Sequence, residues 1–120
     1  MTTNEQIDVL IIYPDGRATD VCKIDKSLKA MQSIVGGYIE LAGSFNGLDI
    51  WCNEEGLLIG LEYNLMASRI LGAMPGRTDN PKIVGTVLVT GSPDADGATT
   101  SIGAEGLESL LEVVAKIQSV

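Results

Sequence analysis

The stretch between residues 36 and 64 constrains the fold of this chain more than any other. The glycine pair at 36–37 is typical of a helix end, because glycine readily takes the left-handed conformation of a C-cap. The Asn-Gly pair at 46–47 is a hairpin signal, and the Asn-Glu-Glu-Gly sequence at 53–56 fits a type I turn followed by a glycine bulge. Reversals this closely spaced indicate hairpin strands instead of long crossover connections.

Apolar and β-branched segments around these turns predict the strands. The segment at 7–13 is almost continuously apolar, as a central strand should be. The segment at 48–52 alternates, which puts Ile50 and Cys52 on one face and Trp51 on the other. Strands are expected at residues 7–13, 18–24, 38–42, 48–52, 57–61 and 83–90.

Three helices are expected, and the first and last show apolar residues at three- and four-residue spacing. The first follows Asp25, a good N-cap, and ends at the glycine pair. Asn64 is placed to cap a short second helix at 65–71. The third lies within 102–120, and its apolar stripe packs either on the chain's own sheet or on a second copy. The segment before it, 92–101, is rich in Gly, Asp and Thr and is expected to be a flexible linker.

This order of elements predicts an α+β fold. We expect a mainly antiparallel sheet of five to six strands with helices on one face, including an amphipathic C-terminal helix. With 120 residues and 45% hydrophobic content, the chain can bury one core, built mostly from aliphatic side chains because aromatic residues make up 4%. The expected division is a core domain at 1–91, the linker at 92–101 and the terminal helix at 102–120.

The charge balance argues against one class of partner. The formal net charge is −8 and the pI is about 4.3. Nucleic-acid binding draws most of its affinity from Lys and Arg that neutralise phosphates, so direct nucleic-acid binding is not expected. Such a surface either keeps a protein soluble or docks on a basic partner.

The chain also lacks the signals of export and membrane insertion. No run approaches the roughly 18–20 apolar residues of a membrane span. The segment at 1–6 lacks the basic and apolar regions of a signal peptide. Cys22 and Cys52 show no CxxC spacing and are expected to be buried and reduced. A cytoplasmic protein that binds no membrane is therefore expected.

The usual catalytic apparatus is absent from the sequence. There is no histidine, and so no general base of the usual kind near neutral pH. There is no Ser/His/Asp or Cys/His arrangement, no zinc motif, no phosphate loop and no GxGxxG. We expect no catalytic residue, no bound metal and no cofactor.

Acidic residues in the middle of the chain are the first candidates for a binding site. Glu54 and Glu55 are adjacent on an expected turn, where they could serve acid/base chemistry, hold a hard cation or simply be solvated. Glu40 lies close to Tyr38, and Glu62 precedes a tyrosine. A carboxylate beside a tyrosine can recognise amino or hydroxyl groups, although a strand-edge acid is the simpler interpretation.

One aromatic residue and two arginines complete the candidates. Trp51 would be a stacking platform or an interface residue if exposed, or a core residue if it lies under a helix. Arg69 and Arg77 lie in and around an irregular Gly/Pro-containing stretch, where they either contact an anion or are simply exposed.

Several segments in fixed order resemble a known family. They are Val-Gly-Gly-Tyr-Ile-Glu at 35–40, Cys-Asn-Glu-Glu-Gly at 52–56, and Ile-Val-Gly-Thr-Val-Leu-Val at 83–89, with Asn64 between. The chain resembles, over residues 7–90, the small proteins grouped as domain of unknown function 3846. Leu-Glu stands at 61–62 where the family usually has Leu-Pro, and the linker and terminal helix also depart from it.

The resemblance implies an accessory protein of bacteriophages, plasmids or bacteria, with no activity assigned. The positions that it would carry over as a shared site are Tyr38, Glu40, Asn53, Glu54, Glu55 and Asn64. Backbone geometry explains several of them equally well. The candidate binding residues are Tyr38, Glu40, Trp51, Asn53, Glu54, Glu55, Asn64, Arg69 and Arg77.

Three functional hypotheses follow. The first is a non-enzymatic phage or mobile-element protein that holds a basic protein surface, as an inhibitor of host defence would. The second is an oligomeric binder of a nucleotide-like ligand, with Trp51 or Tyr38 stacking and Arg69 or Arg77 on phosphate, and with the terminal helix as a homo-oligomer contact. The third is an enzyme, which would need the glutamates at 40, 54, 55 and 62 to converge.

Overall fold

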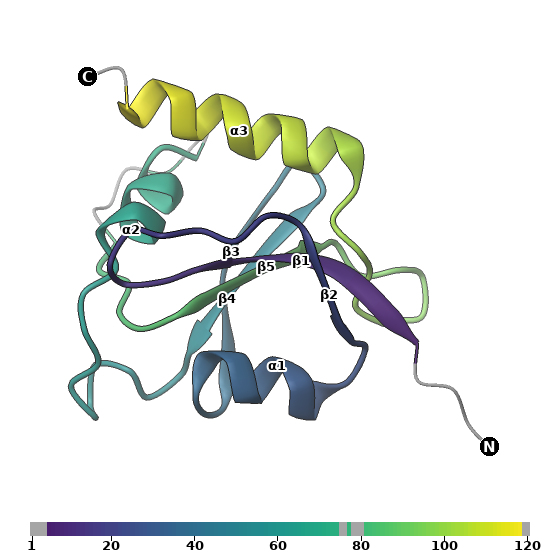
Figure 1. Ribbon diagram of the computed structural model, residues 1–120, viewed down its shortest axis with the longest axis horizontal. Coiled ribbons are helices and arrows are strands. Elements are labelled where there is room, and N and C mark those ends of the chain that lie inside the picture. The colour runs from purple at the N-terminus through teal and green to yellow at the C-terminus, as the bar shows by residue number, and fades with distance from the viewer. Residues whose placement is uncertain (1–4, 75–76, 78–80, 119–120) are drawn as a thin grey trace.

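The computed structural model describes residues 5–74, 77 and 81–118. Its strands are β1 (Gln6–Ile12), β2 (Cys22–Asp25), β3 (Ile39–Phe45), β4 (Leu48–Asn53) and β5 (Val87–Gly91), and its helices are α1 (Leu28–Val35), α2 (Leu65–Gly72) and α3 (Ala104–Gln118). The strands form one sheet in the order β2-β1-β5-β4-β3, and all neighbours are antiparallel (Figure 1). The expected α+β class and antiparallel sheet are confirmed.

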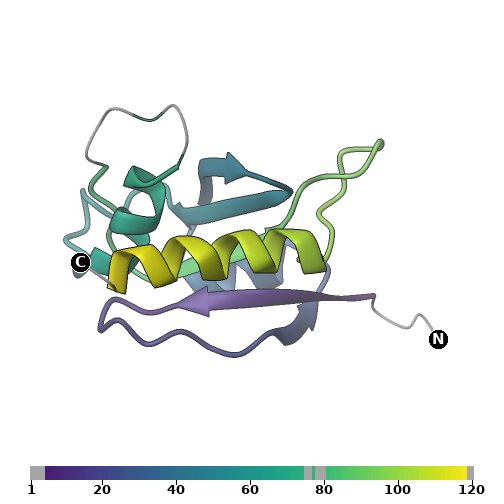
Figure 2. The same ribbon diagram turned by 90° about the horizontal axis from the view of Figure 1, so that it is seen from above.

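Helices cover both faces of this sheet. Helix α1 packs on one face, and α2 and α3 pack on the other (Figures 1 and 2). The expectation of helices on one face only is therefore wrong. The reason lies in the central strand β5, where Val87 and Val89 join the core on the α2 and α3 side while Leu88 joins the core on the α1 side. A strand that is apolar on both sides needs cover on both.

Helix α3 packs against the sheet of its own chain. Leu110 and Val113 are buried in the same cluster as Leu48 and Ile50 of β4. The approach is close at Gly106, where an added Cβ would lie 2.8 Å from a methyl carbon of Leu48. Of the two arrangements left open for the apolar stripe, the structure shows packing on the chain's own sheet.

The loop between β5 and α3 is hydrogen-bonded at both ends. The Ser92 N–H donates to the Gly47 carbonyl (3.0 Å), and the Gly91 N–H donates to the Thr100 carbonyl (3.0 Å). The Asp8 N–H donates to Ser101 Oγ (2.9 Å). These bonds hold both ends of the segment 92–101 against the sheet, while its expected flexibility stays a prediction.

Two expected helix caps are confirmed and one is wrong. Gly36 ends α1 with φ of 82° in the left-handed region, and the Asn64 side chain accepts from the Ala67 N–H at the start of α2. Asp25 does not cap α1 because it belongs to β2. The cap is Ser27, whose Oγ accepts from the Ala30 N–H at 3.1 Å.

Three of the expected strands differ clearly from the structure. The strand expected at 18–24 begins only at Cys22, as β2. The strand expected at 57–61 is wrong, because residues 54–60 form turns, with Ile59 N–H donating to the Glu55 carbonyl and Leu61 N–H to the Gly56 carbonyl, both at 3.0 Å. Strand β5 begins at Val87 instead of residue 83. The sheet therefore has five strands.

Candidate functional site

A turn segment, residues 54–60, leaves the sheet at the end of β4 beside the last turn of α1 (Figure 1). Asn53 holds its base: the buried side chain donates through Nδ2 to the Val35 carbonyl (3.2 Å) and accepts through Oδ1 from the Glu55 N–H (2.8 Å). The Glu54 N–H donates to the Tyr38 carbonyl at 2.9 Å. Asn53 therefore positions the 54–60 segment through one buried and one partly buried hydrogen bond.

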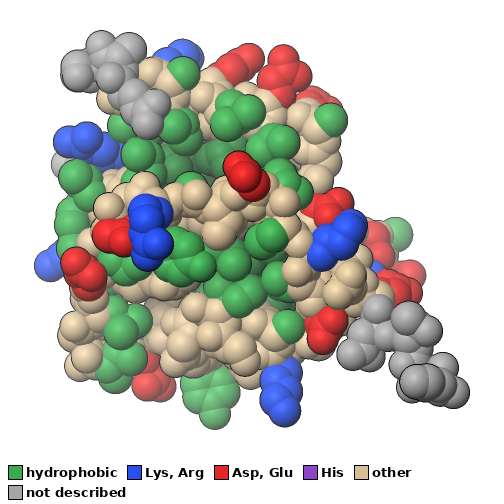
Figure 3. All heavy atoms as spheres, in the orientation of Figure 1, with side chains coloured by type: hydrophobic (Ala, Val, Ile, Leu, Met, Phe, Trp, Pro, Cys, Tyr) green, Lys and Arg blue, Asp and Glu red, His purple; other side chains and the backbone are tan. Residues whose placement is uncertain are grey.

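The 54–60 segment exposes consecutive large apolar side chains. Leu57, Leu58 and Ile59 are 64%, 87% and 56% exposed, and the nearby Tyr38 is 66% exposed. Figure 3 shows hydrophobic side chains reaching the surface at the lower left, where this segment lies. Single exposed apolar residues are ordinary, but three in succession on one segment make it a candidate for a binding surface.

The 54–60 segment separates two hollows. On one side, Tyr38, Glu55 and Ile59 line the Tyr38 hollow, which has a volume of about 390 Å³ and also includes Gln32, Gly36, Gly37 and Asn53. On the other side lies the Glu40 hollow of about 310 Å³, lined by Glu40, Leu41, Ala42, Cys52, Asn53, Glu54, Leu57, Arg77, Pro81, Lys82, Ile83 and Val84. Leu58, the most exposed of the three aliphatic residues, lines neither.

Charges of both signs line the Glu40 hollow. Glu40 and Glu54 are exposed there, and Arg77 donates through Nη1 to the Ala42 carbonyl at 3.2 Å. Within the part of the chain that the structure describes, Glu40, Glu54 and Glu55 form no ion pair. Their charges are therefore available to a partner.

The cysteine in the Glu40 hollow is protected from ionisation. Burial, and next the negative charge of Glu40 on the paired strand, raise the pKa of the Cys52 thiol. The protonated thiol is a poor nucleophile. Both cysteines are free, as expected, although Cys22 is only half-buried.

Asn64 and Trp51 have structural roles away from the 54–60 segment. Asn64 is fully buried, and its Nδ2 donates to the carbonyls of Ile12 (3.1 Å) and Gly85 (2.9 Å). Trp51 is half-buried on the α1 side of the sheet, with its indole N–H donating to Thr90 Oγ1 at 3.0 Å. Trp51 therefore packs against the core on the α1 side but is neither fully exposed nor fully buried.

The residue pairs of the nucleotide hypothesis are not brought together. Tyr38 and Arg77 lie in different hollows, and Arg69 lies in a groove on α2 that contains neither Tyr38 nor Trp51. Of the four glutamates in the enzyme hypothesis, those at 40 and 54 share a hollow, Glu55 lies in the other, and Glu62 lines neither.

The structure unites six of the nine candidate residues around the 54–60 segment. They are Tyr38, Glu40, Asn53, Glu54, Glu55 and Arg77. The sequence reasoning missed the aliphatic residues at 57–59 because it assigned them to a strand. Their lack of alternation, between glycines at 56 and 60, is the signal that could have found them.

Neither a metal cluster nor a membrane-spanning helix is present in the described part of the chain. Among residues 5–74, 77 and 81–118, no three His, Cys, Asp or Glu side chains are grouped so that they could hold a metal ion. No helix within these same ranges has the length and apolar character needed to cross a membrane.

Comparison with known proteins identifies the family. No curated protein and no solved structure matches the chain significantly. The family model described as domain of unknown function (DUF3846) matches residues 7–115. This match extends past residue 90, where the sequence resemblance ended, and takes in the 92–101 loop and most of α3. The chain therefore belongs to the DUF3846 family.

Proposed function

We propose that this chain is a non-enzymatic binding protein that holds a protein partner through the 54–60 segment and the two hollows beside it. The observation that carries the proposal is the exposure of Leu57, Leu58 and Ile59 on a segment whose base is hydrogen-bonded. A fixed segment loses less conformational entropy on binding than a mobile one. Burial of one such side chain contributes about 1.5–3 kcal/mol, so the three together can drive association.

The charges around the segment indicate the chemistry of the partner. Glu54 and Glu55 flank the base, one in each hollow, and Glu40 adds a third carboxylate. A partner with an apolar centre and flanking Lys or Arg side chains complements this arrangement. Its association should weaken as salt rises, because exposed charges are screened within about 8–10 Å at physiological ionic strength.

The proposed setting is the cytoplasm of a cell that carries a phage or another mobile element. There the partner would be a host protein, and occupation of a defence protein's basic surface would inhibit it. The resemblance to small phage and plasmid proteins supports this setting, and so does the lack of catalytic motifs in the sequence. Inhibition by occupancy needs shape and charge complementarity and no reactive group.

A displayed peptide library tests the proposal directly, because it samples many partner chemistries at once. The purified chain should select peptides with an apolar centre flanked by Lys or Arg. In titrations of a selected peptide, Leu58→Asp should lower the affinity at least about tenfold, since it places a charge at the centre of the contact. The double variant Glu54→Gln/Glu55→Gln should lower it severalfold and flatten its salt dependence.

A matched control distinguishes the effect of the two glutamates at the site from the effect of the net charge of the protein. The double variant Glu108→Gln/Glu112→Gln on α3 changes the net charge by the same amount at exposed positions. It should leave the affinity for the selected peptide unchanged. Equal losses in the two double variants, or affinity unaffected by Leu58→Asp, would contradict the proposed site.

A further inference from the structure

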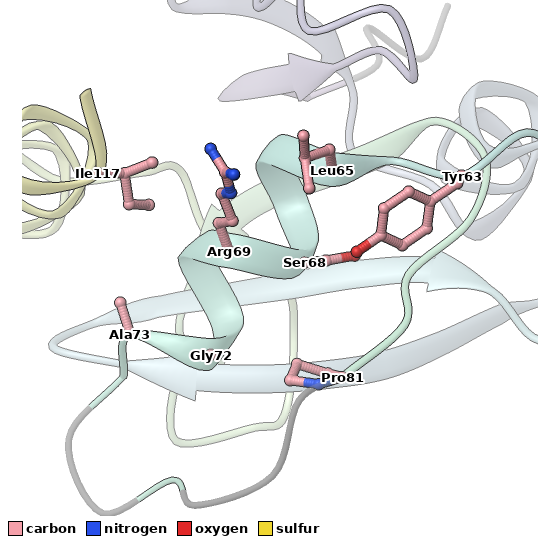
Figure 4. Close-up of a pocket in the computed structure, with 8 residues that line it drawn as sticks. All are labelled: Tyr63, Leu65, Ser68, Arg69, Gly72, Ala73, Pro81 and Ile117. Atoms are coloured by element: carbon pink, nitrogen blue, oxygen red, sulfur yellow. The ribbon is translucent and has the colours of Figure 1, made fainter. Parts of the chain in front are cut away.

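A third depression, a groove that shares only Pro81 with the described lining of the Glu40 hollow, runs over the outward side of α2 (Figure 4). The helix contributes four residues at three- and four-residue spacing to it, and Ile117 of α3, Tyr63, Ala73 and Pro81 complete the lining. The four residues of α2 are Leu65, Ser68, Arg69 and Gly72. The volume of the groove is about 590 Å³, within the range of about 300–1,000 Å³ that is usual for small-molecule sites.

Among the described residues, the groove carries a charge opposite to that of the chain. Although the net charge is −8, no carboxylate of the described residues lines the groove, and Arg69 is its one charged residue within the ranges 5–74, 77 and 81–118. Figure 4 shows the Arg69 side chain standing out from α2. The guanidinium of this exposed residue has no hydrogen bond or ion pair within the described ranges 5–74, 77 and 81–118.

The described lining of the groove contains two other polar side chains, Ser68 and Tyr63, and only the Tyr63 hydroxyl is available to donate a hydrogen bond to a ligand. Ser68 Oγ donates to the Asn64 carbonyl (2.8 Å) and accepts from the Ile83 N–H (2.9 Å), so its one donor is used. The Tyr63 hydroxyl makes no hydrogen bond to any residue that the structure describes. The available donors are therefore one guanidinium and one phenol.

Exposed apolar surface lines the rest of the groove. Leu65 and Tyr63 are 45% and 43% exposed, and Ile117 and Pro81 are partly buried. Gly72 has no side chain, so it leaves space for a ligand at the bottom of the groove. A ligand in this groove would therefore remove apolar surface from water along its length and meet a positive charge at Arg69.

We propose that the groove binds a small amphipathic carboxylic acid in its ionised form. Its carboxylate pairs with the Arg69 guanidinium and accepts from the Tyr63 hydroxyl, while its apolar body lies against Leu65 and Ile117. A single guanidinium matches a carboxylate because the two planar groups can form two parallel hydrogen bonds.

A phosphate ester fits the groove less well than a carboxylate. Its second negative charge would meet no second cation among the described residues that line the groove. The start of α2 supplies no substitute at Ala67, because its N–H is already bonded to Asn64 Oδ1 at 3.0 Å. The groove therefore favours a monoanion.

Titration with decanoate, followed by backbone amide NMR, tests this assignment. Decanoate below its micellar concentration should shift amide signals of α2 and of the end of α3. Decanol and decyltrimethylammonium have similar apolar bodies without the negative charge, and each should bind at least tenfold more weakly. Decyl phosphate should bind no more tightly than decanoate.

Two variants locate the site and one provides the control. Arg69→Gln should weaken decanoate binding at least tenfold. Gly72→Leu should weaken it similarly by filling the floor, and its first added carbon has room because a Cβ there would lie 3.7 Å from Pro81. Arg17→Gln removes an exposed arginine that is paired with Asp15, and should leave binding unchanged.

Several results would overturn the proposal. If decanol binds as tightly as decanoate, the groove recognises only the apolar body of the ligand and not its negative charge. If decyl phosphate binds more tightly than decanoate, the carboxylate assignment is wrong. Unchanged affinity in both Arg69→Gln and Gly72→Leu, with unaltered melting temperatures, would place the ligand elsewhere. None of these results depends on the 54–60 segment, so the two proposals fail or survive separately.

Discussion

Helix α3 and the 54–60 segment both carry clusters of aliphatic residues, yet only one of the two clusters is buried. In α3, Leu110 and Val113 lie on one side of a regular helix and are 4% and 9% exposed. In the 54–60 segment, Leu57, Leu58 and Ile59 follow one another through turns and stay mostly exposed. Helical spacing collects apolar side chains on one face that a sheet can cover, whereas consecutive residues in a turn point in different directions.

The difference in burial between the α3 residues and the aliphatic residues of the 54–60 segment indicates different roles in folding. The stripe of α3 stabilises the fold, because the sheet already covers it. The aliphatic residues of the 54–60 segment contribute little to the fold and remain available for a partner. The following predictions test this contrast in order of the expected effect.

The largest effect should come from truncating one leucine in each region. Leu110→Ala should lower the free energy of unfolding by about 3 kcal/mol, because a buried methyl-rich side chain is lost and a cavity remains. Leu58→Ala should change it by less than about 0.5 kcal/mol, since the side chain is 87% exposed. Urea denaturation of both variants measures the difference. A comparable loss in Leu58→Ala would mean that the 54–60 segment is part of the core.

The next effect concerns Asn64, which supports the fold away from the 54–60 segment. Asn64→Ala should lower the free energy of unfolding by about 2 kcal/mol, because the cap of α2 is lost and two buried carbonyls lose a donor. Thermal and urea unfolding measure this loss. Peptide binding at the 54–60 segment should be unaffected at temperatures where the variant is folded, and altered binding would contradict the structural role.

Two glycine replacements test how closely α3 is docked. Gly106→Ala should destabilise the protein by about 1 kcal/mol despite the better helix propensity of alanine, because the added methyl group crowds Leu48. Gly72→Ala in α2 should stabilise it by about 0.5 kcal/mol, since the new carbon meets only an ordinary contact with Pro81. Calorimetric melting of both proteins provides the measurement. A stabilised Gly106→Ala variant would show a looser contact between α3 and the sheet.

The smallest effect concerns Cys52, where β4 leads into the 54–60 segment. Because burial raises the pKa of this thiol from its usual value of 9.0, the folded state holds the proton more tightly than the unfolded state. The stability that this provides is present below pH 9 and is lost as the pH rises through the folded pKa.

A comparison with Cys52→Ser measures the effect. Between pH 8 and 10 the wild type should lose slightly more stability than this variant, as followed by urea unfolding. Thiol labelling at pH 8 should modify Cys22 before Cys52. Faster labelling of Cys52 would contradict the burial that raises its pKa.

Several features of the fold were predictable because their causes are local. Gly36 ends α1 and Asn64 begins α2, as the sequence indicated, since a cap depends on residues within one helical turn. The Asn46-Gly47 turn has φ of 44° and 83°, the left-handed conformations that this residue pair takes readily. The acids around residues 40 and 54–55 were also named in advance, because their places beside a tyrosine and on an expected turn are visible in the sequence.

The features that the sequence did not predict depended on which edges and faces of the sheet were already covered by other strands and helices. Strand β4 lies between β5 and β3, so no free edge remained beside it for a returning strand at 57–61, and that segment became exposed turns. The separation of Trp51 from Arg69 likewise follows from helices covering both faces of the sheet, since Trp51 lies on the α1 side and Arg69 on α2. Caps and turns follow from short-range contacts along the chain, whereas strand pairing and burial follow from competition between distant segments for the same edges and faces.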